Sequence, residues 1–156
     1  MPLEILSRSE EQTAGVASGF AKLLRAGDIV FLIGQLGAGK TFFIRHAAEA
    51  LGVGEPVTSP SYTMAQTYSS IIRIHHLDLY RLSSFDAEDS MDFEEFFEDG
   101  AITFIEWPES AAPFIEKPDA VIRIDHVDLN SRRISIESRN DRIAGGLETL
   151  NANTGC

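Results

Sequence analysis

The spacing of apolar residues predicts a strand and then a helix at the start of the chain. Residues 3–6 fit a short strand, and Ser9 with Gln12 three positions later fits a capping box, which marks a helix start. We expect this helix to end at Gly27. Its apolar residues recur at helical spacing, and they are Val16, Ala17, Phe20, Leu23 and Leu24.

The next apolar segment, residues 29–33, is continuous and not periodic. Such a run is typical of a strand that is buried on both faces, as in a parallel sheet. The glycine-rich residues 34–39 predict a loop, and a helix follows from Lys40 until Gly52 and Gly54 close it. The sequence thus predicts a strand, a loop and a helix in direct succession.

Later segments predict five more strands and one acidic helical stretch, over residues 85–97. The strands are expected at residues 63–68, 71–77, 101–105, 120–124 and 133–136, with a turn at Asn130-Ser131 before the last. Alternating strands and helices indicate an α/β fold. We expect one domain over residues 1–140 and a flexible tail over residues 141–156, because the end from Gly145 is polar.

Composition limits the classes of protein that fit. A chain of 156 residues with 44% hydrophobic and 24% charged residues is long enough for one domain with its own core. It has no amino-terminal signal pattern and no apolar stretch long enough to span a bilayer. Its single cysteine, Cys156, favours a reducing compartment. These features predict a cytoplasmic protein.

The charge of the chain is strongly negative and uneven. A formal net charge of −11 argues against broad contact with bare nucleic acid, whose phosphates would repel it. Residues 82–116 contain many acids and no Lys or Arg. This stretch is either a solvated face that keeps the protein soluble or a docking surface for a basic partner protein.

The clearest chemical motif is the loop Gly34-Gln35-Leu36-Gly37-Ala38-Gly39-Lys40-Thr41, which matches the phosphate-binding pattern G-x-x-x-x-G-K-S/T in full. Glycines let backbone N–H groups approach phosphate oxygens closely, and the helix start adds the positive end of its dipole. Lys40 would neutralise the β- and γ-phosphates, and the Thr41 hydroxyl would ligate Mg²⁺. The motif predicts a P-loop NTPase, with a three-layer α/β/α sandwich and a mixed, mostly parallel sheet.

Two acidic residues, Asp78 and Glu106, each follow an apolar strand and are candidates for the carboxylate near the metal. Because parallel strands end at the ligand crevice, both would point toward the phosphates. Either could instead be a surface acid or a helix cap. His75 and His76 are adjacent on a strand and face opposite sides, so we expect ordinary sheet residues and not a shared metal site.

The loop Thr58-Ser59-Pro60-Ser61-Tyr62 follows the P-loop helix and carries several hydroxyl groups. It either folds over the γ-phosphate and responds to its presence, as switch loops do, or is an ordinary turn. The residues alone leave both interpretations open.

Four segments together make the sequence similar to the TsaE (YjeE) family of bacterial ATPases. They occur in family order and spacing, as the P-loop at 34–41, then Val57 to Tyr62, then His76-Leu77-Asp78-Leu79-Tyr80-Arg81, then Glu106-Trp107-Pro108-Glu109. The P-loop alone is not specific, whereas the four together are. The resemblance covers residues 3–138. The chain departs from it at Ser61, where the family usually has Thr, but Ser keeps the hydroxyl.

The resemblance implies a function that composition does not indicate. Members of this family serve the threonylcarbamoyl modification of adenosine in tRNAs that read codons starting with A, together with the TsaD and TsaB proteins. A member binds ATP and Mg²⁺ at the edge of that complex, and its hydrolysis of ATP is thought to reset the complex between turnovers. The partners, and not this chain, would hold the tRNA, and the isolated chain would hydrolyse ATP slowly.

The resemblance also implies roles for individual residues. Lys40 and the amides of the loop from Gly34 would bind phosphate, and Thr41 with Glu106 would hold Mg²⁺. Asp78 would orient or activate the attacking water, or hold the metal through a water.

Two further parts of the site come from the same resemblance. The switch-like loop would contribute Thr58, Ser59 and Ser61 to the nucleotide site. Trp107, beside the metal acid, would pack near the nucleotide or be a plain core aromatic.

Two other functions would also use a P-loop. A small-metabolite kinase usually closes an arginine-bearing lid over the transferred phosphate, but residues 83–100 contain no Arg or Lys. A GTP-dependent switch protein would carry the Asn-Lys-x-Asp guanine signature, which this sequence lacks. ATP is therefore the expected nucleotide. A phosphorylated small-molecule product would indicate a kinase, and competition between ATP and GTP for the purified protein would test the GTP-dependent switch.

Overall fold

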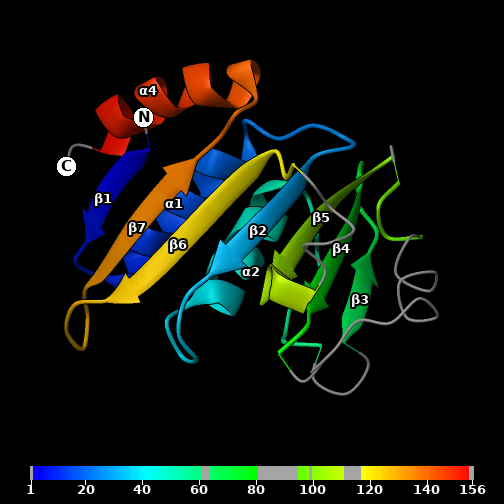
Figure 1. Cartoon of the computed structure of the whole chain (residues 1–156), viewed down its shortest axis with the longest axis horizontal. Coiled ribbons are helices and arrows are strands. Elements are labelled where there is room, and N and C mark those ends of the chain that lie inside the picture. Colours follow the sequence, from blue (N-terminus) through cyan, green and yellow to red (C-terminus); the bar gives the residue numbers. More distant parts are fainter. Residues whose placement is uncertain (1, 61–63, 81–94, 99, 111–116, 155–156) are drawn as a thin grey trace.

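The computed structural model describes residues 2–60, 64–80, 95–98, 100–110 and 117–154. Figure 1 shows the course of the chain through its strands and helices. In chain order these are β1 (Leu3–Ser7), α1 (Glu10–Ala21), β2 (Ile29–Ile33), α2 (Lys40–Ala50), β3 (Ala65–Tyr68), β4 (Arg73–Asp78), β5 (Ala101–Glu106), the 3-10 turn η1 (Pro108–Ser110), β6 (Ala120–His126), β7 (Arg132–Glu137) and α4 (Asp141–Thr154).

One seven-stranded sheet, in the order β1-β7-β6-β2-β5-β4-β3, organises the molecule (Figure 1). The four central strands, β6, β2, β5 and β4, run parallel. The outer strands, β7 and β1 on one side and β3 on the other, pair antiparallel. β5 is buried at every position, as a central parallel strand covered on both faces should be. The carboxyl ends of the parallel strands meet at one edge of the sheet, which we call the carboxyl edge.

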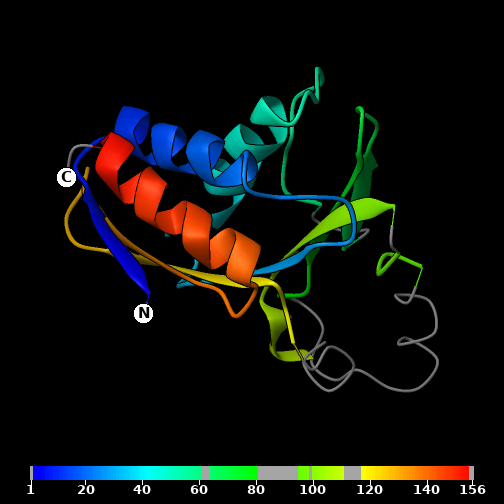
Figure 2. The ribbon, with the colours of Figure 1, turned by 90° about the horizontal axis from the view of Figure 1, so that it is seen from above.

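The helices α1, α2 and α4 all lie on one face of the sheet (Figure 2). The main core fills the space between them and the strands, with Phe20, Phe43 and Phe104 fully buried in it. Because side chains alternate along a strand, other positions face the opposite side. There a smaller apolar cluster includes Phe31 and Ile105.

The predicted α/β fold is confirmed, with a mixed sheet that is parallel through its centre. Each predicted strand is present. The helical stretch predicted at 85–97 lies mostly outside the described residues, so the second helical layer of the predicted sandwich remains a prediction. Among the described helices, none is long and apolar enough to cross a membrane.

Helix α1 is shorter than the sequence pattern suggested. It ends at Ala21, and not at Gly27 as expected. The N–H groups of Leu23 and Leu24 then donate to carbonyl oxygens only three residues back, Phe20 O and Ala21 O. The Asp28 carboxylate then accepts a hydrogen bond from Arg25 N at 2.7 Å. Such local bonds from a side chain to the backbone compete with helix continuation.

The expected flexible tail over residues 141–156 is wrong for residues 141–154, which form helix α4. Ile143, Leu147 and Leu150 recur at helical spacing and are buried in the main core. A Cβ atom at Gly146 would lie 2.3 Å from Leu23 Cδ2, so the glycine permits close packing of α4 against the turn that follows α1. Glu148 and Thr149, two of the polar residues that suggested a tail, are exposed on the other side of this amphipathic helix.

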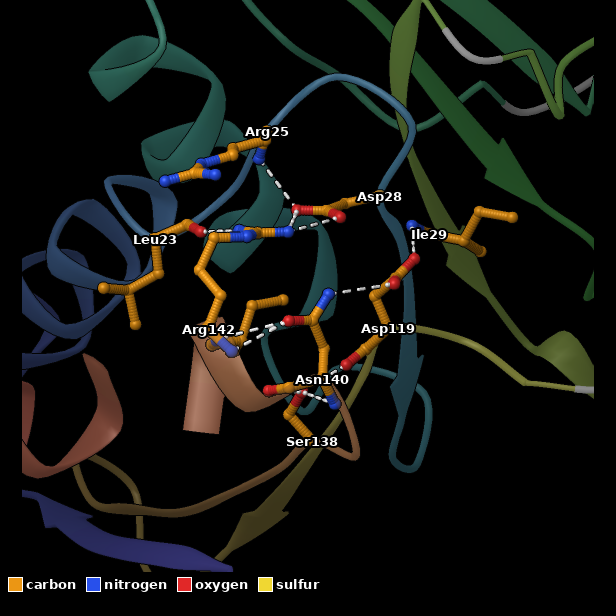
Figure 3. A network of polar contacts seen from close by, with 9 residues as sticks. Leu23, Arg25, Asp28, Ile29, Asp119, Ser138, Asn140 and Arg142 are labelled. Carbon is orange, nitrogen blue, oxygen red and sulfur yellow. Dashed lines mark hydrogen bonds and ion pairs between the residues drawn. The ribbon is translucent and has the colours of Figure 1, made fainter. Parts of the chain in front are cut away.

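A polar network fastens the start of α4 to the amino-terminal ends of two strands (Figure 3). Arg142 donates to both carboxylate oxygens of Asp28, at 2.9 and 3.1 Å. Asn140 caps the helix, because its Oδ1 accepts from Arg142 N at 3.0 Å, and its Nδ2 donates to Asp119 at 3.3 Å. Asp119 in turn accepts from Ile29 N, at the start of β2, at 2.8 Å. We call this group the amino-edge network.

Candidate functional site

The P-loop, residues 34–41, connects β2 to α2 at the carboxyl edge of the sheet. At Gly34 a Cβ atom would lie 2.4 Å from Ile124 O, so only glycine lets the loop leave β2 so close to β6. Gly37 and Gly39 have φ of 80° and 110°, which favours glycine. Gly39 is the N-cap of α2, and no side chain caps this helix start. The first amides of α2 are therefore left for a ligand, as anion-binding helices require.

Lys40 is the buried cation of the site, with 4% of its surface exposed. Its ammonium group donates to two carbonyl oxygens of its own loop, Gly34 O and, at 3.1 Å, Gln35 O. Burial lowers the pKa of Lys40, and the nearby carboxylates, Glu106 first among them, oppose that shift. The lysine thus lies within the loop and bonded to it, where an anion could replace the carbonyls.

Asp78 and Glu106 end two neighbouring parallel strands, β4 and β5, and are paired in register. The prediction that both lie at the carboxyl edge is confirmed. Thr41 Oγ1 donates to Glu106 Oε2 at 2.8 Å, which joins the loop hydroxyl to the strand carboxylate. Glu106 is buried and Asp78 is half-buried.

His76 is a functional candidate that the sequence analysis missed. It was expected to be an ordinary sheet residue, and it does lie on β4. However, its Nε2 is 2.7 Å from Glu106 Oε2, the same oxygen that Thr41 contacts, and its side chain is fully buried. The signal was available, because His76 and Asp78 are two apart on a strand and so share a face. By contrast His75 faces away and bonds Thr67 Oγ1 at 2.8 Å.

The oxygens of Thr41 and Glu106 fit a magnesium ion. Two neighbouring ligands of octahedral Mg²⁺, at about 2.0–2.1 Å from the ion, lie about 2.9 Å apart. The hydrogen bond between Thr41 and Glu106 already places these two oxygens 2.8 Å apart, so both could contact one ion with little movement. In the described parts of the chain, no group of three or more His, Cys, Asp or Glu could hold a metal without help. The pair therefore suits a Mg²⁺ ion that takes its other ligands from phosphate and water, as nucleotide-bound Mg²⁺ does.

The loop after α2 reaches the acidic end of β4. Ser59 Oγ donates to Asp78 Oδ2 at 3.1 Å, and Thr58 N donates to the Tyr68 hydroxyl at 3.4 Å. Arg45, on α2, donates to Val57 O at 3.0 Å and ties the loop to the P-loop helix. Thr58 and Ser59 are exposed at this edge. Ser61 and Tyr62, the last two members of the predicted switch-like loop, lie outside the described residues.

Trp107 lies beside the P-loop. This position fits the interpretation that it packs near a nucleotide. Lys40 Nζ is 4.1 Å from the centre of its ring, and the Tyr80 ring packs on it at 4.9 Å between centroids. Trp107 has φ of 56°, an uncommon conformation for a bulky residue. Conformations of this kind are found preferentially at functional sites.

A cavity of about 220 Å³ lies where these residues meet. Its lining is drawn from the P-loop, the start of α2 and the two strand ends, and comprises Leu36, Gly37, Gly39, Lys40, Thr41, Phe42, Asp78, Glu106 and Trp107. A larger cavity of about 460 Å³ lies between α1 and α4, but it includes no P-loop residue and only one charged side chain, Lys22. The smaller cavity is therefore the better candidate for binding phosphate.

Comparison with known proteins gives one consistent result. The protein family described as "Threonylcarbamoyl adenosine biosynthesis protein TsaE" matches this chain over residues 7–134. A "tRNA threonylcarbamoyladenosine biosynthesis protein TsaE" of Aquifex aeolicus is 35% identical over 136 residues, covering 85% of this chain and 94% of that protein. A protein of Treponema pallidum with the same description is 32% identical over 142 residues, covering 86% and 99%.

A solved structure resembles the whole fold. The crystal structure of Bacillus subtilis YdiB matches with a TM-score of 0.81 and 25% sequence identity. The match covers 98% of this chain and 96% of that one. The likeness therefore includes α4, which the sequence analysis expected to be a tail.

Proposed function

The chain belongs to the TsaE family, which acts in tRNA threonylcarbamoyladenosine biosynthesis, and from that premise we propose that it is the Mg²⁺-dependent, ATP-binding and ATP-hydrolysing subunit of that process. One observation carries the proposal. A complete P-loop lies at the carboxyl edge, and its Thr41 is bonded to the buried Glu106. This is the arrangement in which phosphate and metal are held together.

In this proposal the P-loop binds the triphosphate of ATP. The amides at the start of α2 contact phosphate oxygens. The Lys40 ammonium group also contacts phosphate oxygens, which replace the two carbonyl oxygens that it contacts now. Thr41 and Glu106 hold Mg²⁺, which supplies positive charge to the β- and γ-phosphates. Hydrolysis adds water to the γ-phosphorus and breaks its bond to the bridging oxygen, which gives ADP and inorganic phosphate.

Asp78 is proposed to act on the attacking water. Its carboxylate lies next to Glu106 in register and already accepts a hydrogen bond from Ser59. It would take the proton of the water or orient the water without taking the proton. Ser59 and Thr58 link this position to the loop that follows α2, so that loop would respond to the γ-phosphate.

The proposed partners follow from the family. TsaD and TsaB would complete the assembly, and tRNA would reach this chain only through them, in the cytoplasm. The net charge of −11 supports this division, because such a chain repels a free polyanion. The isolated chain would turn over slowly if partners complete the site.

The test separates binding from hydrolysis at one residue. We expect Asp78→Ala to bind Mg²⁺-ATP within a few-fold of the wild type but to release phosphate at least about a hundredfold more slowly, since general bases typically contribute that much. Binding is measured by calorimetry, and phosphate release with TsaD and TsaB present. Asp78→Asn distinguishes the two roles, because it keeps water orientation and loses the base. Loss of ATP binding in Asp78→Ala would make Asp78 structural.

The same assay addresses the alternative of a small-metabolite kinase. Hydrolysis releases one inorganic phosphate for each ADP formed. ADP formed without free phosphate, together with a phosphorylated small molecule, would replace the ATPase proposal with a kinase.

A further inference from the structure

His76 lies beside Glu106 on the face of the sheet that the helices cover. It is in register with Phe104 on β5, a residue of the main core, and Glu106 follows Phe104 by two positions. Residues two apart on a strand share a face, so His76 and Glu106 lie on the same side of neighbouring strands. The distance from His76 Nε2 to Glu106 Oε2 is 2.7 Å, and neither side chain is more than 4% exposed.

The ring of His76 has one nitrogen that is bonded and one that is not. A carboxylate oxygen only accepts hydrogen bonds, so the bond to Glu106 requires a proton on His76 Nε2. In the described part of the chain, the buried Nδ1 has no hydrogen-bond partner. A buried polar atom without a partner is uncommon in folded proteins and calls for an explanation. An apolar residue, such as Ile74 two positions earlier, would fill the core without it. The donor toward Glu106, and not packing, therefore explains a histidine here.

His76 does not reach the phosphate cavity itself. Its side chain is fully buried, and it is not one of the described residues that line that cavity. Mg²⁺ prefers oxygen ligands, and the Nε2 atom is already bonded to Glu106. His76 can therefore act on the site only through the Glu106 carboxylate.

The Oε2 atom of Glu106 accepts from two donors, and a metal ion would displace only one of them. Thr41 Oγ1 donates to it at 2.8 Å, and under the proposed function this hydroxyl oxygen binds Mg²⁺ instead. A carboxylate oxygen has two lone pairs. One would stay with His76, and the other, now taken by Thr41, would be left for the metal. Outer partners of this kind orient the carboxylates that bind metals.

We propose that His76 is the positioning residue of the magnesium site, whose Nε2–H holds the Glu106 carboxylate in the orientation that binds Mg²⁺ beside Thr41. The inference rests on the proposed function and deepens it, because it adds the group behind the metal ligand. Lys40 and the loop amides bind the triphosphate without His76. His76 therefore controls the part of the ATP affinity that Mg²⁺ supplies, and not the remainder.

The experiment measures the magnesium gain, which is the ratio of the ATP affinity with Mg²⁺ to that with a chelator, by calorimetry. Two variants differ in where they keep an N–H donor, since the amide nitrogen of Gln can reach the place of Nε2 and that of Asn only the place of Nδ1. We expect His76→Asn to lose a wild-type gain of about tenfold, because loss of such a partner weakens metal binding by about that factor. His76→Gln should keep most of the gain. Metal-free ATP should bind both variants as it binds the wild type.

His75→Asn is the matched control. His75 is the neighbouring histidine on β4 and is also buried, but its ring bonds Thr67 and not Glu106. Its magnesium gain should equal that of the wild type. A second measurement needs no variant to fold. Ring-nitrogen magnetic resonance spectra of wild-type protein labelled in histidine, recorded with Mg²⁺ and a non-hydrolysable ATP analogue, should show a proton on His76 Nε2.

Each result has a defined meaning. Loss of the magnesium gain in His76→Asn, with the gain kept in His76→Gln and His75→Asn, supports the inference, as does a proton on Nε2. A full gain in His76→Asn, an equal loss in His76→Gln or His75→Asn, or an Nε2 without a proton overturns it and leaves the proposed function standing. Wild-type protein that binds no ATP, or that binds it without a magnesium gain, overturns the proposed function.

Discussion

The two ends of the parallel strands carry the same kinds of residue in different uses. We call them the amino edge, where the amino-edge network lies, and the carboxyl edge, where the P-loop lies. At the amino-terminal edge, Asp28 receives a two-point contact from Arg142, and Asp119 accepts from Asn140 and Ile29 (Figure 3). At the carboxyl edge, one oxygen of Glu106 is shared by two donors, and the buried lysine bonds to the carbonyls of its own loop.

The difference lies in what the partners are. The amino-edge network joins segments far apart in the chain, so its bonds hold α4, β2 and β6 together. The bonds at the carboxyl edge also join distant segments, such as those of Thr41 and Glu106, but they lie between groups that phosphate and Mg²⁺ would contact instead. Buried charge at the first edge stabilises the fold, and under the proposed function buried charge at the second would be exchanged for a ligand. Burial alone does not distinguish these uses, whereas the identity of the partner does.

The largest expected effect is loss of nucleotide binding in Lys40→Ala. The ammonium group would form charge-assisted bonds to two phosphates, so ATP affinity should fall at least about a hundredfold. The free energy of unfolding should stay within about 1 kcal/mol, because both hydrogen bonds of the ammonium group go to its own loop and its ring contact with Trp107 is a single one. Calorimetry and urea unfolding measure the two quantities. Lys117→Ala is the matched control, since Lys117 is exposed and remote from the P-loop. Wild-type ATP affinity in Lys40→Ala would contradict the proposal that the buried charge at the carboxyl edge serves ligand binding.

The converse prediction, loss of stability without loss of ATP binding, concerns Arg142→Ala at the amino edge. Removing the guanidinium leaves the buried carboxylate of Asp28 without its two-point partner. We expect the free energy of unfolding to fall by about 2–3 kcal/mol, below the range for a fully buried pair because Arg142 is partly exposed. ATP affinity of the folded protein should not change. Arg139→Ala removes an exposed arginine two residues before the helix and controls for loss of charge. If Arg142→Ala weakened ATP binding without loss of stability, the two edges would not be independent.

These paired predictions rest on features that could be predicted from the sequence to different degrees. The continuous apolar run of β2 and the glycines at 34, 37 and 39 predicted the P-loop, because that motif depends on neighbours in the chain. The positions of Asp78 and Glu106 followed from one rule, that parallel strands end at a common edge.

Contacts between distant segments were not predictable in this way. The pairing of β6 with β2 brings the β6–β7 hairpin, residues 126–132, to the P-loop, and no local pattern reports it. The segment of helix α4 was expected to be a tail because the chain is polar from Gly145 onward, and Gly145 and Gly146 themselves disfavour an isolated helix. Packing on α1 overrides that preference. The spacing of His76 and Asp78 places both on one face of β4, but the contact of His76 with Glu106, thirty residues away, follows from no local pattern.

The smallest of the three effects concerns magnesium. Chelation of Mg²⁺ should weaken ATP binding by the wild type about tenfold, because one of the groups that balance phosphate charge is removed. Glu106→Ala should bind metal-free ATP like the wild type and gain little from added Mg²⁺. Calorimetry with and without a chelator measures the gain directly. Glu109→Ala is the matched control, since Glu109 is exposed and lies just beyond the same strand end. A full magnesium effect in Glu106→Ala would remove Glu106 from the metal site.

One measurement tests the central claim most directly, that the polar bonds at the carboxyl edge are exchanged for a nucleotide and those at the amino edge are not. Amide proton–nitrogen correlation spectra of the labelled protein are recorded during titration with Mg²⁺-ATP. We expect the amide signals of Gly37, Gly39 and Thr41 to move, and those of Ile29 and Arg142 to stay in place. P-loop amides that do not move at saturating Mg²⁺-ATP, or equal movement at both edges, would contradict the account.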